Sequence, residues 1–316
     1  MSREKNIRTY IAGSSGMVGQ SLMRSAPADT EIFSTSRSEL DLTRTLDLIE
    51  YFKYNRIEAV IMAAAKVGGI YANSNNQTTF LLENLKIQNS VFEAAIKNNI
   101  KNFIFLGSSC IYPKYARQPI DESQLMSGPL EPTNESYAIA KIVGLRFCRV
   151  IFEELGFNYF TLMPANLYGP GDNFDILNSH VPAALMRRFH EAKISKQKTV
   201  KVWGTGKPYR EFMHVDDLSS ACWHFMNQGV GGQLINIGTG QEMTIKDFSR
   251  KIAKIVGYTG NVEFDSSQPD GTPRKLLNIE KAKSLGWTPK ISLTRGLENT
   301  YNWFTQQYEK GEIRGF

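Results

Sequence analysis

Tyr137 and Lys141 are four residues apart in the segment NESYAIAKIVGLRF. On a helix this spacing places both side chains on one face. A phenol loses its proton at about pH 10, and a neighbouring ammonium group lowers that pKa because it stabilises the phenolate. The pair therefore predicts proton exchange with a substrate oxygen near neutral pH. Because Y-x-x-x-K often arises by chance, its meaning depends on the segments around it.

Two serines and a cysteine follow an apolar run in FIFLGSSCIYP. The run predicts a strand, after which Ser108 or Ser109 is expected to hydrogen-bond and polarise a ketone oxygen. Cys110 has two interpretations from the residues alone. A free cysteine is usually a small buried apolar residue, whereas a thiol beside a reacting carbonyl can serve as a base.

A glycine-rich turn opens the chain in IRTYIAGSSGMVGQSL. Gly13, Gly16 and Gly19 stand between an expected strand and an expected helix. Glycines let the backbone approach a pyrophosphate, and the helix N-terminus adds amide donors. The turn therefore predicts a dinucleotide site, which also includes Ser14, Ser15, Met17 and Val18.

The end of the second expected strand, STSRSELDL, indicates which dinucleotide binds. A site selective for NAD would place Asp or Glu there, whereas here Arg37 stands where a 2′-phosphate would lie. A guanidinium pairs well with phosphate, so NADP(H) is favoured, although a plain surface charge is the alternative. Asp41 is expected to reach the adenine amine.

Short apolar runs alternate with longer helical patterns through the first half of the chain. The helical patterns repeat apolar residues three or four apart, as in NQTTFLLENLKIQNSVFEAAIKNN. This alternation predicts an α/β fold, a doubly wound parallel sheet of the Rossmann type with ligands at the carboxyl ends of its strands. The expected strands are residues 7–12, 31–35, 59–64, 102–107 and 158–164.

The pattern becomes irregular after Pro164, where Gly, Pro and Asn are frequent. The C-terminal part then resembles a second α/β unit. We expect an NADP-binding Rossmann domain of residues 1–164 plus about 200–229. The remaining residues, about 165–199 plus 230–316, are expected to form a smaller α/β substrate-binding lobe.

Composition excludes several classes of protein. The 316 residues are 41% hydrophobic and 22% charged, typical of a globular protein. The three cysteines are widely spaced, so neither a disulfide framework nor a metal site is predicted. The net charge of +6 comes from scattered basic residues, so no nucleic-acid partner is expected. We find no signal peptide or membrane-spanning stretch and expect a cytoplasmic protein.

These motifs together resemble the extended short-chain dehydrogenase/reductase family of nucleotide-sugar enzymes. Further segments resemble one branch, the GDP-L-fucose synthase family: AAAKVGGI, FLGSSCIYP, LEPTNESYAIAK, NLYGP, NSHV, REFMHVDDL and PDGTPRKLL. The resemblance implies that Cys110 is the base and His180 the acid in an epimerisation beside a 4-ketone. It further implies that NADPH reduces this ketone while Tyr137, assisted by Lys141 and Ser108, protonates the oxygen. The alternative for His180 is a structural role or a sugar contact.

The same resemblance assigns binding residues. Further cofactor contacts are implied at Leu106, Gly107, Lys141, Pro164, Asn166, Leu167 and His180. Substrate contacts are implied at Arg188, Trp203, Arg210 and Asp270, with core packing as the alternative for Trp203. Arg187 is expected to face solvent. Relatives can carry a basic residue where this chain has Ser14-Ser15, which leaves Arg37 more of the 2′-phosphate. Related enzymes also suggest a homodimer.

The function that the resemblance implies is conversion of GDP-4-keto-6-deoxy-D-mannose to GDP-L-fucose by C3/C5 epimerisation and C4 reduction. The alternative is a C4 reductase of a related GDP-4-keto-6-deoxy sugar, such as a 6-deoxyheptose, with little or no epimerase activity. A binding protein that senses NADPH without catalysis would be expected to lack Ser108, Tyr137 or Lys141, and all three are present.

Overall fold

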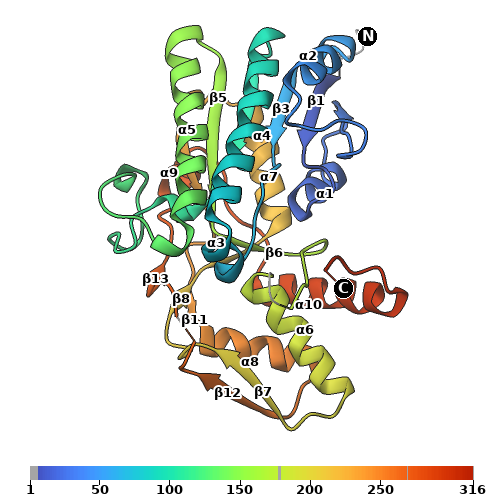
Figure 1. Ribbon diagram of the computed structural model, residues 1–316, viewed down its shortest axis with the longest axis vertical. Helices are drawn as coiled ribbons and strands as arrows, with labels where there is room; N and C mark the ends of the chain where they lie inside the picture. Colours follow the sequence, from blue (N-terminus) through green and yellow to red (C-terminus); the bar gives the residue numbers. More distant parts are fainter. Residues whose placement is uncertain (1–5, 177–178, 269, 316) are drawn as a thin grey trace.

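The computed structural model describes residues 6–176, 179–268 and 270–315 (Figure 1). Its larger part is built on a six-stranded sheet in the order β10-β5-β4-β3-β1-β2. Every neighbouring pair in this sheet is parallel. The strands are β1 (Ile7–Ala12), β2 (Thr30–Phe33), β3 (Ala59–Met62), β4 (Asn102–Leu106), β5 (Asn158–Pro164) and β10 (Leu234–Ile237).

The sequence prediction of a doubly wound parallel sheet is confirmed by this strand order. The chain leaves β1 toward β2 and then returns to the other side of β1 with β3, so the carboxyl ends of β1 and β3 form the switch point. Ligands of such sheets bind at this point. β1 and β5 have the predicted bounds, and β2, β3 and β4 end within two residues of them.

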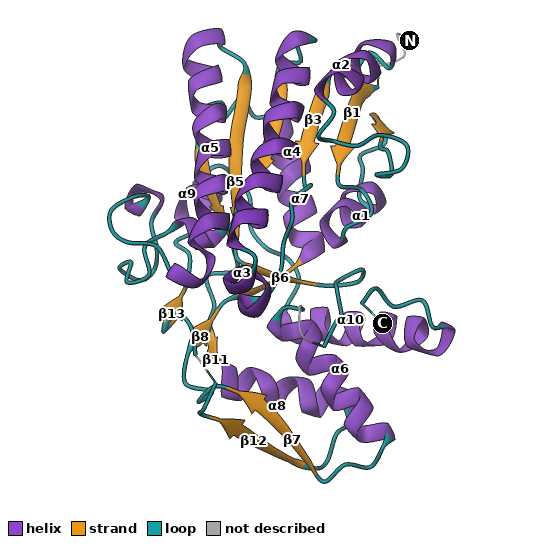
Figure 2. Ribbon diagram, in the orientation of Figure 1, coloured by secondary structure: helices purple, strands orange, loops and turns teal. Residues whose placement is uncertain are grey.

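Helices cover both faces of the sheet (Figure 2). α2, α4 and α5 pack side by side on one face, and α1 packs with α7 on the other. Each face has its own apolar core, and both cores include buried strand residues. The helices are α1 (Met17–Arg24), α2 (Thr45–Tyr54), α3 (Ile70–Asn75), α4 (Gln77–Lys97), α5 (Glu135–Leu155), α7 (Val215–Met226) and α9 (Glu280–Ser284), with 3-10 turns η1 (Ser109–Ile111), η2 (Glu122–Gln124) and η3 (Pro132–Asn134).

The smaller lobe lies below the carboxyl ends of the sheet in Figure 1 and has a third apolar core. A parallel pair, β7 (Thr199–Trp203) and β12 (Asn261–Asp265), packs with α6 (Val181–Ile194), α8 (Ile245–Val256) and α10 (Leu293–Lys310). A three-stranded sheet has the order β11-β8-β13, from Met243–Thr244, Tyr209–Arg210 and Arg274–Lys275. β6 (Asn166–Tyr168) pairs with β9 (Phe212–His214) between the two parts.

Two of the expected domain boundaries differ from this arrangement. β7 and β8 lie in the smaller lobe, although residues 200–229 were assigned to the Rossmann domain. β10 pairs with β5 in the large sheet, although residues from 230 onward were assigned to the lobe. The burial of the strands gives the reason: β10 is largely buried, as a strand covered by helices on both faces must be, whereas β7 alternates between buried and exposed residues. We therefore propose moving residues 199–210 to the lobe and 234–237 to the Rossmann domain.

Glu211 fastens the junction between the two parts. Its carboxylate is 1% exposed and accepts hydrogen bonds from the backbone N–H groups of Thr239, Gly240 and Leu277. Leu277 in turn forms a parallel bridge with Ile120. One buried carboxylate thus binds two distant segments, at residues 239–240 and at Leu277. Through Leu277 it fixes the chain after β13 beside Ile120.

Some features are absent from the described residues. No helix among residues 6–176, 179–268 and 270–315 has the length and apolar composition needed to cross a lipid bilayer. The same ranges contain no group of three or more His, Cys, Asp and Glu side chains placed to hold a metal ion. Cys110, Cys148 and Cys222 are all free and buried.

Gly144 tests how closely α5 must approach the sheet. A Cβ atom at position 144 would overlap the ring of Phe105 on β4. We expect Gly144→Ala to lower the free energy of unfolding by about 1–3 kcal/mol because of this overlap. The direction is opposite to the gain of about 1 kcal/mol that alanine brings to an unobstructed helix. Urea denaturation measures the change.

The double variant Gly144→Ala/Phe105→Leu is the control for this prediction. Its loss should be smaller than the sum of the two single losses, because the smaller side chain makes room for the new methyl group. Equal or increased stability of Gly144→Ala would contradict the close approach.

Candidate active site

Tyr137 and Lys141 lie in the N-terminal half of α5, facing the end of β4. The buried stripe of this helix continues through Gly144, Leu145 and Cys148, so packing against the sheet orients both side chains. Lys141 is 4% exposed, and its ammonium group donates a hydrogen bond of 2.8 Å to the carbonyl of Leu106, the last residue of β4. Its Nζ lies 5.8 Å from the centroid of the Tyr137 ring. The predicted pair is therefore brought together.

The pKa of Tyr137 differs from the sequence expectation. Burial raises it, the nearby Cys110 raises it further, and a hydrogen bond with Ser108 lowers it. Burial also lowers the pKa of Lys141 to about 8, because the charged form loses hydration. The pKa of the phenol is therefore raised, not lowered as the sequence predicts, and burial is the main cause. A protonated phenol is the form required of a proton donor.

Ser108 and Cys110 complete this cluster at the end of β4. η1 begins directly after Ser108 and turns the chain so that the hydroxyl meets the phenol of Tyr137. The same hydroxyl lowers the pKa of the Cys110 thiol, which is 6% exposed. Of the two serines, Ser108 is therefore the one placed beside Tyr137, as the motif indicated. Ser109 is buried at 5% exposure.

Lys275 is a charged neighbour that the sequence analysis did not single out, although it lies within the quoted PDGTPRKLL segment. It comes from β13 and lines a small hollow together with Cys110. Burial raises the pKa of the Cys110 thiol, whereas Lys275 and Lys141 lower it. Two cations from different parts of the chain thus converge on one thiol.

His180 stands directly before α6, at its N-cap position, and its side chain makes no capping hydrogen bond. The residue is exposed to solvent, yet the protein around it lowers the pKa of the imidazole, because it disfavours the charged ring. Because the imidazole does not cap α6, its ring nitrogens can interact with a ligand. Asn178 of the NSHV segment lies outside the described residues.

The glycine turn after β1 has the shape that a pyrophosphate requires. Gly13 has a φ of +88°, and a Cβ there would lie 2.7 Å from the backbone nitrogen of Ala64. A Cβ at Gly19 would overlap the carbonyl of Gly13. α1 begins after Gly16 without a side-chain cap, so its first amide groups are open to an anion. Ser14 is buried, whereas Ser15 is exposed and Met17 and Val18 are half-buried.

The loop after β2 leaves the cation of Arg37 exposed. The nearby carboxylate of Glu39 accepts hydrogen bonds from Ser36 N and Oγ at 2.7 and 2.8 Å. Asp41 accepts two hydrogen bonds from Thr43 at 2.9 Å, and these, with help from Arg37, hold the pKa of Asp41 below its usual value. The carboxylates of Glu39 and Asp41 both accept hydrogen bonds from residues of this loop. Arg37 is exposed and can therefore meet a phosphate.

The end of β5 and the start of β6 supply the remaining expected cofactor residues. Pro164 is the last residue of β5, and Asn166 and Leu167 begin β6. The Asn166 side chain donates a 2.8 Å hydrogen bond to the carbonyl of Glu211. Leu106 and Gly107 lie at the end of the neighbouring strand β4. All five residues thus lie at the carboxyl end of the sheet.

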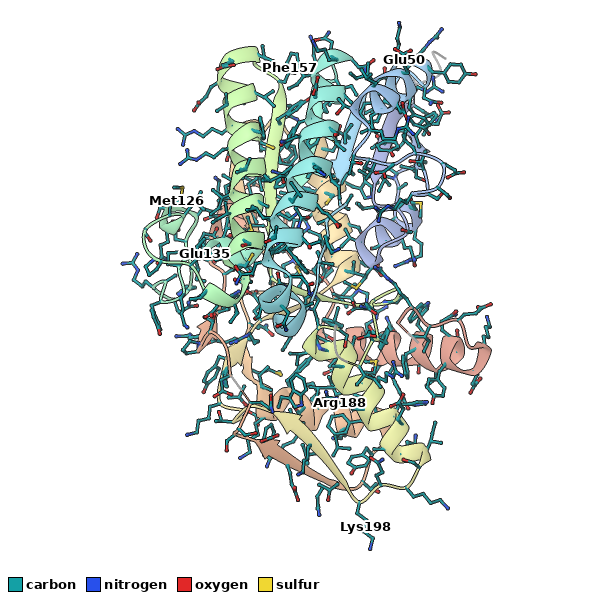
Figure 3. The ribbon with its side chains drawn as sticks, in the orientation of Figure 1. Glu50, Met126, Glu135, Phe157, Arg188 and Lys198 are labelled. Carbon is teal, nitrogen blue, oxygen red and sulfur yellow. The ribbon has the colours of Figure 1, made fainter. Side chains whose placement is uncertain are left out.

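Arg188 and Trp203 meet in the smaller lobe, where Figure 3 labels Arg188 on α6. The guanidinium carbon lies 5.2 Å from the centroid of the indole ring. Trp203 is 45% exposed, so it is not a core residue, and one aromatic surface remains available for stacking. The expectation for Arg187 is wrong: it is 9% exposed and donates hydrogen bonds to the carbonyls of Phe174 and Gly315.

Arg210 and Asp270 also lie close together. The Arg210 guanidinium donates to the carbonyl of Asp270 at 3.4 Å, and burial lowers its pKa to about 10. The Asp270 carboxylate accepts two 2.7 Å hydrogen bonds from Thr205. Asp270 therefore already fixes the turn after β7, in addition to any contact with a ligand.

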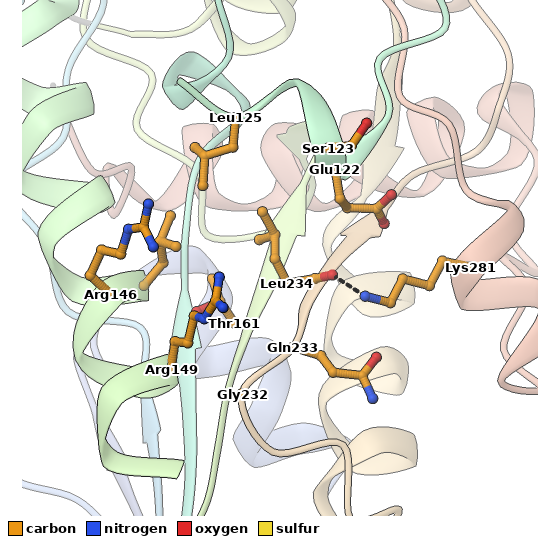
Figure 4. A pocket seen from close by; sticks show the side chains of 11 residues that line it. Glu122, Ser123, Leu125, Arg146, Arg149, Thr161, Gly232, Gln233, Leu234 and Lys281 are labelled. Atoms are coloured by element: carbon orange, nitrogen blue, oxygen red, sulfur yellow. Dashed lines mark hydrogen bonds between the residues drawn. The ribbon is translucent and has the colours of Figure 1, made fainter. Parts of the chain in front are cut away.

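A separate hollow of about 410 Å³ lies away from this cluster (Figure 4). Arg146 and Arg149 of α5 line it together with Lys281, whose Nζ donates a 2.8 Å hydrogen bond to the carbonyl of Leu234. The hollow shares no lining residue with the Tyr137–Cys110 cluster. The chemistry-bearing side chains therefore lie elsewhere, at the carboxyl end of the sheet.

Sequence comparison places this chain among characterised proteins. A profile of the "NAD dependent epimerase/dehydratase family" matches residues 9–238. GDP-L-fucose synthase 1 of Arabidopsis thaliana is 48% identical over 303 residues, which cover 95% of this chain and 94% of that protein. GDP-L-fucose synthase of Escherichia coli (strain K12) is 46% identical over 96% of this chain and 98% of its own length.

Solved structures agree with the fold. The GDP-mannoheptose C4 reductase from Campylobacter jejuni with NADP bound has a TM-score of 0.85 and 33% sequence identity to this chain. The match covers 95% of this chain and 99% of the reductase.

Proposed function

The chain belongs to the NAD dependent epimerase/dehydratase family and, within it, to the GDP-L-fucose synthases, and we propose on this basis that it is an NADPH-dependent epimerase/reductase. Its substrate is GDP-4-keto-6-deoxy-D-mannose and its product GDP-L-fucose. The observation that carries the proposal is the cluster of Ser108, Tyr137 and Lys141 with the thiol of Cys110 beside it. The first three suit ketone reduction, and the thiol suits proton removal next to the ketone.

The epimerisation relies on the acidity that a 4-ketone gives to the protons at C3 and C5. The thiolate of Cys110 removes such a proton, and the electron pair moves onto the ketone oxygen as an enolate. The imidazolium of His180 then returns a proton to the opposite side of the carbon, which inverts it. Free thiol and imidazole groups titrate near enough to neutrality for both transfers, whereas here burial raises the pKa of Cys110 and lowers that of His180. Exchange with solvent restores the thiolate and the imidazolium.

The reduction uses the other members of the cluster. NADPH supplies the hydride that reaches C4. Ser108 hydrogen-bonds the ketone oxygen and polarises it, and the phenol of Tyr137 gives that oxygen its proton. Burial keeps this phenol protonated until the oxygen gains charge. The charge of Lys141 then stabilises the phenolate that remains.

The proposed ligand contacts follow the charges of the Rossmann part and of the smaller lobe. The glycine turn and exposed Arg37 suit the pyrophosphate and 2′-phosphate of NADPH. In the smaller lobe, the cations of Arg188 and Arg210 suit the diphosphate of the sugar nucleotide, and the exposed Trp203 ring suits stacking on a planar ring. Asp270 holds Arg210 in place and offers further acceptor sites.

A second candidate is a C4 reductase of a GDP-4-keto heptose, because the similar solved structure is a GDP-mannoheptose C4 reductase. The two candidates differ in whether the thiol removes protons. With substrate in deuterated water and no cofactor, the epimerase incorporates deuterium at C3 and C5. The absence of incorporation in the unaltered protein would favour the plain reductase.

Cys110→Ser is expected to slow deuterium incorporation at C3 and C5 about 100-fold or more, because a hydroxyl is a far weaker acid than a thiol and supplies no comparable base. NMR of the recovered substrate measures the incorporation. As the control, oxidation of GDP-L-fucose by NADP⁺ reports the C4 step alone and should persist in the variant. Unchanged incorporation would return Cys110 to the class of packing residues.

Tyr137→Phe is expected to lower kcat for NADPH oxidation about 100-fold or more, because no group remains to protonate the ketone oxygen. The affinity for NADPH should stay within about twofold, as judged by fluorescence titration. Tyr115→Phe is the matched control, since Tyr115 is 76% exposed. Normal turnover of the Tyr137 variant would overturn the assignment of the proton donor.

We also propose a homodimer that pairs the outer faces of α4 and α5. These neighbouring helices expose several large apolar side chains, at Leu82, Ile139, Phe147 and Val150. Such a patch is what a two-fold interface requires. Light scattering should give twice the chain mass of 35.6 kDa.

The free state of all three cysteines supports a reducing, cytoplasmic location, which fractionation of the native cell tests.

A further inference from the structure

Building on the proposed function, we propose that Lys275 is a positioning residue that keeps Cys110 in its thiolate form for the epimerisation. The residue lies on β13, far from Cys110 in the sequence. The inference stands on the way the fold brings this ammonium group to the thiol, and on the charges around the pair.

The backbone around Lys275 is fixed on both sides. In the parallel pair β13–β8, Lys275 is in register with Arg210. After the strand, the Leu276 amide donates to Gln118 Oε1 at 2.8 Å and the Leu277 amide donates to Glu211 Oε2 at 2.9 Å. The first bond holds the chain after β13 against the segment that follows Cys110, and the second holds it against Glu211, directly before β9.

Lys275 and Cys110 line one small hollow. Arg274 is held by the carboxylate of Glu242, with its Nε 2.8 Å from Oε1. Successive side chains of a strand point in opposite directions, so Lys275 faces away from Glu242. It lines the small hollow that Cys110, Lys114 and Glu131 also line. Cys110 and Lys275 thus border the same hollow, which Arg274 lines as well.

The charged groups that face the pair favour a cation beside the sulfur. Lys141 of α5 reaches Cys110 as well, and Tyr137 lies on the same helix. Around Lys275, Arg210 repels the ammonium charge and Glu131 stabilises it. Glu131 is itself paired with Lys114 at 3.0 Å. Glu131 therefore offsets part of the positive charge of Lys114, Arg210 and Lys275. A thiolate at Cys110 would be the second negative charge in this group.

The contributions to the acidity of the thiol agree with this geometry. Burial raises the pKa of Cys110, and Lys275 is the strongest of the influences that lower it. In return, Cys110 raises the pKa of Lys275, which burial lowers. Each group thus favours the charged form of the other, as in an ion pair. Without Lys275, burial would act on the thiol with less opposition.

The test compares Lys275→Met with Lys275→Arg, which keeps the charge, and with Lys283→Met. Lys283 pairs with Glu280 on the surface, so its variant loses one lysine away from the thiol. In the substrate-free proteins, the rate of Cys110 alkylation by iodoacetamide is followed against pH by peptide mass spectrometry. The midpoint should move to higher pH in Lys275→Met and remain in place in the other two.

Substrate exchange gives the second readout. Deuterium incorporation at C3 and C5 should slow about tenfold at neutral pH in Lys275→Met and recover as the pH is raised, because hydroxide then ionises the thiol. Oxidation of GDP-L-fucose by NADP⁺ should change little, which shows that the variant is folded and binds its ligands.

An unmoved alkylation midpoint in Lys275→Met would overturn the proposal and limit Lys275 to structure or to binding of the substrate. An equal shift in Lys283→Met would overturn it too, since net charge alone would then be responsible. Failure of the proposed function is a separate result: the unaltered protein would incorporate no deuterium, while the alkylation midpoints would still report whether Lys275 acts on the thiol.

Discussion

The hydrogen bond from Lys141 to the carbonyl of Leu106 is the link on which the site depends. It joins the helix that carries Tyr137 to the end of the strand that leads to Ser108 and Cys110. The link holds because α5 lies unusually close to β4, where Gly144 leaves room for the ring of Phe105. A displacement of the helix would separate the phenol, the hydroxyl and the thiol together.

This close packing also determines the electrostatics. Burial raises the pKa of Tyr137 and Cys110 and lowers that of Lys141 to about 8, so each group tends toward its neutral form. Neutral groups suit a proton donor but not a base. The thiol therefore needs cations close by, whereas the phenol needs its proton until hydride arrives. The same buried site can keep the phenol protonated and favour the thiolate, because Lys141 and Lys275 both act on the thiol from different segments.

Much of this arrangement was predictable from the sequence, because its signals are local. The glycine turn, the apolar runs of β1 and β5 and the spacing of Tyr137 and Lys141 each lie within one short segment. The errors concern features that depend on contacts between distant segments. Arg187 is buried by the C-terminal residues around Gly315, and β10 joins β5 from far along the chain. Lys275 reaches Cys110 only through the pairing of β13 with β8, which no periodicity predicts.

The side chains that we assign to reduction and those that we assign to epimerisation come from different parts of the chain. Ser108, Tyr137 and Lys141, to which we assign ketone reduction, belong to the Rossmann part. Lys275 and His180 come from segments after β5, and of the two Lys275 shares a small hollow with Cys110. Epimerisation thus depends on the placement of the C-terminal segments against the sheet, which Glu211 secures with its backbone hydrogen bonds. Two enzymes of this fold can therefore share the reduction site and differ in epimerisation through changes in the C-terminal segments alone.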